Sequence, residues 1–226
     1  MTDREESVRM HSGAYVEEYE FKPISRIARL LPRMQLHRDE ELVDIACGNG
    51  MLAPLVHDRV RAYHGVDFAP EFVEAARRKA AKAGIANATF HCADVVDFAK
   101  ANPGRFGVAT ALDFSEHIDD DDFVAIFSAV RGAMVPGGRL YIHTPNRTFL
   151  LELLKQWGIV PQFPQHIAVR DAAHHVRLLE RCGFARSNIR TEELPHYNVL
   201  RFLHPLRKLP LVGKYVAARL FITCSQ

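Results

Sequence analysis

Short apolar, β-branched runs alternate with helical patterns along the chain from residue 41 onward. The runs predict strands at 42–46, 62–66, 88–93, 106–112 and 139–144. The helical patterns predict helices beginning at 52–56 and spanning 70–83 and 123–134, and the Pro-Gly-Gly triplet at 136–138 predicts a turn. This β-α-β-α order with short links predicts an α/β fold with a parallel sheet and right-handed crossovers.

The regular alternation is interrupted twice and is preceded by a helical segment. Residues 145–170 contain prolines and glutamines and have the character of an insertion, and residues 195–213 hold three prolines where a closing antiparallel strand pair is expected. The first 35 residues predict one or two helices before the sheet.

The composition limits the class of protein. Apolar residues make up 48% of the chain and charged residues 25%, as in ordinary soluble domains. The charged start MTDREE is unlike a signal peptide, and the four cysteines show no CxxC spacing, which favours a reduced, cytoplasmic setting. A net charge of +2 gives no reason to expect a nucleic-acid partner.

Candidate ligand-binding residues follow three successive predicted strands. The first strand leads into a glycine turn in the segment ELVDIACGNG (41–50), where glycines permit a tight bend and close approach of a ligand. Asp67 ends the second strand and Asp94 follows the third. Open α/β sheets bind ligands at this edge, although either aspartate is also a candidate helix cap. The full GxGxxG pattern is absent because Ala46 occupies its first position, which disfavours a nucleotide-dependent oxidoreductase.

Over residues 41–147, five ordered motifs together resemble class I S-adenosylmethionine (SAM) dependent methyltransferases. They are DIACGNG, GVDFAPEFVEAAR, ATFHCADVVDF, FGVATALDFSEHI and VPGGRLYIHTPNRT. The resemblance implies a Rossmann-like three-layer sandwich with a mostly parallel seven-stranded sheet and an antiparallel closing strand. It also implies SAM as cofactor and S-adenosylhomocysteine as product. The residues that it places against the cofactor are Tyr19, Asp44, Ala46, Gly48, Asp67, Phe68, Asp94, Val95 and Asp113.

By the same resemblance, the parts of the cofactor fall to different residues. Asp44, Ala46 and Gly48 would flank the methionine part, Asp67 the ribose, and Asp94 with Val95 the adenine. The organisation implied is a single domain over 1–226, with an N-terminal helical lid at 1–38 and acceptor-pocket insertions at 145–170 and 195–215. Tyr19 would lie on the lid, for which ordinary helix packing is the alternative.

One subgroup, the ubiquinone-biosynthesis O-methyltransferases, is similar to this chain at residues 113–118 and 144–148. Its Glu-x-x-Glu-His pattern is associated with a divalent metal, which implies Asp113, Glu116 and His117 as ligands of Mg²⁺ or Mn²⁺. Asp113 replaces the longer glutamate, so catalysis without a metal stays an alternative. His117 or His166 is a candidate general base, because imidazole titrates near neutrality, with Glu116 beside them.

We therefore expect SAM-dependent methyl transfer to a small molecule, with a hydroxyl oxygen as the favoured acceptor. The alternatives are a metal-independent N- or C-methyltransferase and a SAM-binding protein without catalysis. Beyond Pro195 the chain has five Arg or Lys and no carboxylate, interleaved with apolar residues. For this tail we favour a wall of the acceptor pocket, and peripheral membrane contact through residues 199–221 is the alternative.

Overall fold

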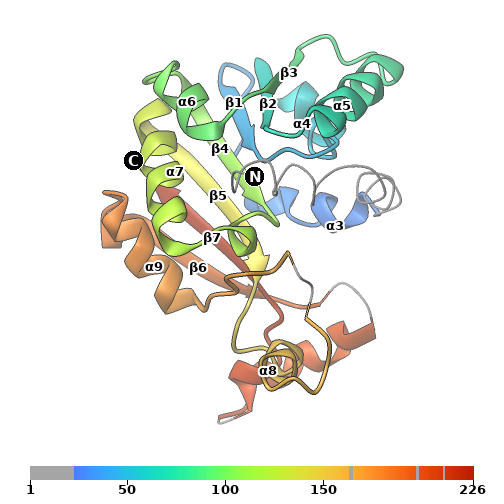
Figure 1. Ribbon diagram of the computed structural model, residues 1–226, viewed down its shortest axis with the longest axis vertical. Helices are drawn as coiled ribbons and strands as arrows, with labels where there is room; N and C mark the ends of the chain where they lie inside the picture. Colours follow the sequence, from blue (N-terminus) through green and yellow to red (C-terminus); the bar gives the residue numbers. More distant parts are fainter. Residues whose placement is uncertain (1–22, 163–164, 197–198, 211) are drawn as a thin grey trace, which may run out of the picture. The chain divides into compact units, whose positions relative to one another are not determined.

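The computed structural model describes residues 23–162, 165–196, 199–210 and 212–226, and its seven strands form one sheet in the order β3-β2-β1-β4-β5-β7-β6 (Figure 1). The strands are β1 (Glu41–Ile45), β2 (Ala62–Asp67), β3 (Ala88–Cys92), β4 (Phe106–Leu112), β5 (Met134–Pro145), β6 (Ile189–Leu194) and β7 (Arg219–Ser225). β1 pairs in parallel with β2 and β4, β2 pairs in parallel with β3, and β6 pairs antiparallel with β7. The predicted mostly parallel seven-stranded sheet is confirmed.

The helices follow the strands as the sequence pattern predicts. The α-helices of the described residues are α3 (Ser25–Ala28), α4 (Ala53–Val56), α5 (Pro70–Lys82), α6 (Val95–Lys100), α7 (Asp120–Ala133), α8 (Leu150–Gln156) and α9 (Ala172–Arg181). The 3-10 helices are η1 (Leu31–Arg33), η2 (His57–Arg59), η3 (Ser115–His117), η4 (Arg186–Asn188), η5 (Val199–Lys208) and η6 (Gly213–Tyr215). After α5, Gly84 takes the left-handed conformation (φ 67°) that commonly ends a helix.

The turn predicted at Pro136–Gly138 is wrong, because β5 begins at Met134 and runs through these residues. Gly137 takes a positive φ of 76° inside the strand. A Cβ on Gly138 would lie only 2.9 Å from the Val135 carbonyl oxygen and 3.1 Å from that of Phe106. Gly138 therefore serves a close backbone approach, whereas Gly137 serves the positive φ and has open space around it.

The chain divides into two compact units. Unit 1 holds the described residues up to Ala111 together with Gly132–Arg139, and unit 2 holds Leu112–Arg131 and Leu140–Gln226. β4 and β5 therefore contribute residues to both units. Organisation as a single domain stays a prediction.

Unit 1 aligns the carboxyl ends of its parallel strands. Asp44 of β1 lies opposite Gly65 of β2, and Asp67 at the end of β2 lies opposite Cys92 of β3. α5 packs against β2 and β3, as Figure 1 shows. Because nearly every position of β1, β2 and β4 is buried, the side chains at the ends of these strands have a rigid support.

Unit 2 contains the antiparallel pair and the segments that interrupt it. α9 packs against β6, and η5 and η6 lie in the connection from β6 to β7, as the prolines at 195–213 predict. The Asp119 carboxylate accepts hydrogen bonds from the Asp121 and Asp122 N–H groups and caps the start of α7. Within the described parts of the chain, no helix has the length and apolar character needed to span a bilayer.

Candidate functional site

The turn after β1 has a backbone that only a few residue types tolerate. Ala46, Gly48 and Gly50 adopt φ values of 52°, 53° and 71°, all in the left-handed region. A Cβ on Gly50 would lie 2.9 Å from Cε1 of Phe90, so this position has no room for a side chain. Ala46 keeps the conformation expected of the glycine that it replaces, at a cost of roughly 1–2 kcal/mol.

Asp67 joins this turn to the end of β2. The Gly48 N–H donates to Asp67 Oδ2 (2.9 Å) and the Ala69 N–H donates to Oδ1 (3.0 Å). An ionised carboxylate offers about four acceptor positions, and these two bonds fix its orientation at the turn. The role of Asp67 as the ribose ligand stays a prediction.

Asp44 is buried beneath the turn and held by two hydroxyl groups. Tyr63 Oη donates to Oδ2 and Thr110 Oγ1 donates to Oδ1, each at 2.6 Å. Burial raises the pKa of Asp44 to about 6, and the charge of Asp67 adds to this, while the two hydroxyl donors act in the opposite direction. The sequence pattern found Asp44 but missed Tyr63 and Thr110, because the register of β2 and β4 brings them to it.

Asn49 provides an independent sign of a ligand at the turn. Its side chain is fully buried, yet neither Oδ1 nor Nδ2 has a hydrogen-bond partner among the described residues. A buried amide without partners costs about 1–3 kcal/mol, so such groups in native proteins are normally satisfied by a bound molecule or water. The turn therefore fits a polar ligand, such as the methionine part of SAM.

The remaining predicted cofactor residues have different surroundings. Asp94 is the N-cap of α6, where Oδ1 accepts from the Val96 (2.8 Å) and Asp97 (3.2 Å) N–H groups. The helix-cap alternative is thus confirmed for Asp94, which caps α6 through Oδ1. Phe68 packs against a buried cluster with Phe72. Tyr19 lies outside the described residues.

In unit 2, Asp113 follows β4 in the left-handed conformation (φ 54°). Its N–H donates to the His143 carbonyl oxygen (2.7 Å), and its Oδ1 lies 2.8 Å from His143 Nδ1 and 3.1 Å from Arg219 Nη1. Arg219 of β7 therefore forms an ion pair with the Asp113 carboxylate, and the His143 ring of β5 lies beside it. The sequence pattern did not identify Arg219 as its partner.

Glu116 is the most unusual carboxyl group of this unit. It lies in η3, is 1% exposed, and accepts a hydrogen bond from Thr144 Oγ1 (3.1 Å). Burial raises the pKa of Glu116 to about 8, and the negative charge of Asp113 adds to the rise, whereas Arg219 opposes it. A carboxyl group in such surroundings exchanges protons near neutral pH or pairs with a cation.

Glu116, His117 and His166 form a cluster in which one ligand atom of each lies within 4.8 Å of the others. His117 Nδ1 lies 2.8 Å from the Gln165 carbonyl oxygen, which can only accept, so Nδ1 carries the proton and the lone pair of neutral His117 is on Nε2. Burial, with a contribution from His117, lowers the pKa of His166 to about 4, which keeps His166 neutral at physiological pH. The structure thus joins the two predicted bases with Glu116.

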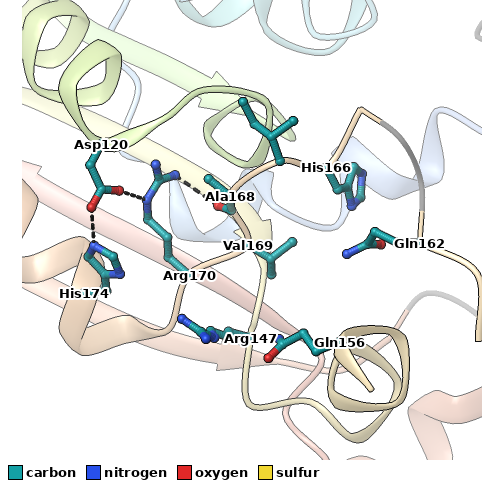
Figure 2. Close-up of a pocket in the computed structure, with 10 residues that line it drawn as sticks. Asp120, Arg147, Gln156, Gln162, His166, Ala168, Val169, Arg170 and His174 are labelled. Carbon is teal, nitrogen blue, oxygen red and sulfur yellow. Dashed lines mark hydrogen bonds and ion pairs between the residues drawn. The ribbon is translucent and has the colours of Figure 1, made fainter. Parts of the chain in front are cut away.

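A cavity of about 320 Å³ lies beside this cluster and shares His166 with it (Figure 2). Its lining residues are Asp120, Arg147, Gln156, Gln162, His166, Ile167, Ala168, Val169, Arg170 and His174. Eight of these ten belong to the predicted acceptor insertion at 145–170, and none of the described residues of 195–215 is among them. The volume is at the small end of the roughly 300–1,000 Å³ of ligand sites, which suits a small acceptor.

Comparisons with known proteins place these features in context. A family model described as a methyltransferase domain matches residues 15–186. A "Ubiquinone biosynthesis O-methyltransferase" of Serratia proteamaculans is 32% identical over 74% of this chain and 70% of its own length, and one of Idiomarina loihiensis is 32% identical over 62% and 58%. A SAM-dependent methyltransferase structure from Archaeoglobus fulgidus matches with a TM-score of 0.72 and 17% identity, over 95% of this chain and all of that one.

Proposed function

Because the chain belongs to the methyltransferase-domain family, with SAM as the methyl donor, we propose that it methylates a hydroxyl oxygen of a small molecule. The observation that supports oxygen as the acceptor atom is the cluster of Glu116, His117 and His166 beside a small cavity. Such a cluster removes a proton, which a neutral hydroxyl must lose when its oxygen is methylated.

Unit 1 would hold the donor. Asp67 accepts hydrogen bonds from the ribose hydroxyls, and the left-handed turn at 46–50 leaves its backbone open to the methionine part. The buried amide of Asn49 gains the partners that it lacks among the described residues. Asp94 with Val95 would meet the adenine while Asp94 Oδ1 caps α6.

The chemical step needs little beyond orientation and one base. The acceptor oxygen attacks the methyl carbon, the S–CH₃ bond breaks with its electron pair going to sulfur, and neutral S-adenosylhomocysteine leaves. The hydroxyl proton passes to His117 Nε2, whose lone pair is set by the Nδ1 bond to Gln165, or to His166. Imidazole is the side chain that most often acts as the general base for such a proton.

We propose that the implied divalent metal, where one is used, is held by Glu116, His117 and His166. The Nδ1 donor bond of His117 to a backbone carbonyl is the arrangement typical of a metal-bound histidine. Asp113, which the resemblance implies as a ligand, has its Oδ1 in an ion pair with Arg219 and close to the His143 ring instead. A Mg²⁺ or Mn²⁺ ion there would lower the pKa of the acceptor hydroxyl.

For residues 199–221 we propose peripheral contact with an anionic membrane surface. Phe202 and Leu209 are 69% and 50% exposed, and Arg207 and Lys208 accompany them. Exposed apolar side chains with basic neighbours suit an interfacial segment. Sedimentation with anionic liposomes tests this: a Phe202→Ser/Leu209→Ser variant should remain in the supernatant while the parent protein pellets. A parent protein that does not pellet would contradict membrane contact.

The test of the proposed function is calorimetric titration with S-adenosylhomocysteine, with NAD as the control ligand. We expect micromolar binding of S-adenosylhomocysteine and none of NAD. Added Mg²⁺ or Mn²⁺ should give further heat that is lost in His166→Ala and kept in Arg177→Ala, an exposed position on α9. Absence of S-adenosylhomocysteine binding would contradict the function, and methyl transfer that resists EDTA would favour the metal-free route.

A further inference from the structure

The charges that line the 320 Å³ cavity do not balance. Arg170 is buried, and its Nε pairs with Asp120 Oδ1 (2.8 Å) while its other nitrogens donate to backbone carbonyl oxygens, among them that of Ser115 (2.6 Å). His174 Nε2 lies within hydrogen-bond distance of Asp120 Oδ2, at 2.8 Å. Both oxygens of the cavity's one lining carboxylate are thus already used. The guanidinium of Arg147 is left without an ion pair among the described residues.

Arg147 is held by its backbone and presents an unused side chain. Its N–H donates to the Arg170 carbonyl oxygen (3.1 Å). The preceding Asn146 is buried, and its Nδ2 donates to the Ala217 carbonyl oxygen (2.9 Å). Figure 2 shows the Arg147 side chain extending beside Gln156, apart from the paired group of Asp120, Arg170 and His174. The backbone of Arg147 is therefore held in place before any ligand binds.

The other lining groups complete an environment for an anionic ligand. Gln156 and Gln162 bring amide groups, which donate hydrogen bonds, and Ile167 and Val169 give an apolar wall. An arginine fork binds carboxylate or phosphate oxygens in pairs, with charge-assisted bonds. His166 lines the same cavity and belongs to the cluster that would take the acceptor's proton.

We propose that this cavity binds the acceptor through an oxyanion, a carboxylate or a phosphate, that Arg147 holds together with Gln156 and Gln162. The substrates would then be small hydroxylated anions whose hydroxyl lies toward His166. The inference rests on the proposed methyl transfer, because that reaction gives His166 its role. Carboxylate and phosphate share the chemistry that the cavity recognises, and the experiment distinguishes them.

The test uses three ring fragments of similar size that differ in charge: benzoate, phenyl phosphate and neutral benzamide. Each is titrated into ¹⁵N-labelled protein, and affinities are read from amide chemical shifts. We expect at least one anion to bind about tenfold or more tightly than benzamide, the factor that one charge-assisted pair supplies. The tighter anion identifies a carboxylate or a phosphate acceptor.

Substitutions decide whether Arg147 is responsible. Arg147→Ala should abolish the preference for the anion, Arg147→Lys should keep part of it, and the matched control Arg177→Ala should keep all of it. The proposal is overturned if benzamide binds as well as both anions, if the preference survives in Arg147→Ala, or if Arg177→Ala loses it too. S-Adenosylhomocysteine affinity, measured on the same samples, separates this failure from failure of the proposed function.

Discussion

Ala46 and Asp113 are the non-glycine residues with positive φ in the described chain, and each directly follows a strand of the sheet. Strained backbone of this kind persists where the surrounding structure fixes it, and it is concentrated at functional sites. The two positions begin the glycine turn of unit 1 and the acidic segment of unit 2. In both units, the residue with the strained backbone therefore lies next to candidate functional side chains.

Replacing Ala46 by glycine should relieve strain. The left-handed conformation costs alanine roughly 1–2 kcal/mol, and glycine avoids this cost. Glycine also gives the unfolded chain more conformational freedom, which offsets about 0.4–1 kcal/mol of the stability gained. We expect Ala46→Gly to raise the free energy of unfolding by about 0.5–1 kcal/mol, as measured by urea denaturation. In the matched control Ala81→Gly, on the exposed face of α5, the same change should destabilise by about 1 kcal/mol. Loss of stability in Ala46→Gly would contradict the strain.

His175 should make the protein sensitive to acid. It is fully buried, with Nδ1 3.0 Å from the Asp171 carbonyl oxygen and Nε2 3.3 Å from Ser115 Oγ. Burial lowers the pKa of His175 from 6.5 to about 4. Because the folded-state pKa is depressed, its stabilising contribution is complete above pH 6.5 and is lost as the pH falls towards 4, by about 3 kcal/mol in total.

Urea denaturation between pH 4 and 8 measures this contribution. His175→Gln should flatten the loss of stability between pH 6.5 and 4, whereas the control His37→Gln, at an exposed position, should retain the slope of the parent protein. Equal slopes in the parent and His175→Gln would show that His175 does not titrate in this range.

At the scale of elements, the pairing of β2 with β3 depends on one glycine. Gly65 lies opposite Phe90 in the register, and a Cβ on Gly65 would lie 2.6 Å from Phe90 Cδ1 and 2.9 Å from Cys47 Sγ. We expect Gly65→Ala to destabilise the protein by about 1–3 kcal/mol, and Phe90→Leu to recover part of this loss in the double variant. A double-mutant cycle in urea measures the coupling. The control Gly132→Ala in α7, where the Cβ meets nothing within 4 Å, should not destabilise.

Asp94 combines a cap for α6 with a predicted role in cofactor binding, and two substitutions separate them. Asp94→Ala should lose about 1 kcal/mol of stability with the cap, while Asp94→Asn keeps the capping oxygen and should be nearly neutral. Both should weaken S-adenosylhomocysteine binding in calorimetry if the carboxylate meets the adenine amino group. Unchanged affinity in both variants would leave Asp94 with the cap alone.

The sequence predicts elements and strand-end residues well because both depend on local patterns. Alternation and glycine placement locate β4 and α5 almost to the residue, and aspartates at strand ends are visible without a structure. Partners such as Tyr63 and Thr110 escape prediction because only strand register brings them to Asp44. The misplaced turn at 136–138 shows that glycine permits a turn but does not require one.

The sequence predicts an acceptor insertion at 145–170, but it does not predict the charges that line its cavity, for the same reason. Arg147 has a place in a motif, but its unbalanced charge is visible only once Asp120, Arg170 and His174 are seen to pair with one another. Gln156 follows no pattern that marks it as a ligand. The resemblance identified His117 and Glu116, whereas the proximity of His166 depends on the path of the 165–170 segment.

For the whole molecule, we predict that cofactor binding leaves a single unfolding transition and raises its midpoint temperature, Tm. β4 and β5 each run through both compact units, so unfolding one unit breaks strands of the other. S-Adenosylhomocysteine at about 100 times its dissociation constant adds about 2.7 kcal/mol, which at roughly 2–4 °C per kcal/mol raises Tm by about 5–10 °C. Scanning calorimetry should show one peak that moves as a whole. Two peaks, of which only one responds to the ligand, would mean that the unit that binds the cofactor unfolds independently of the other unit.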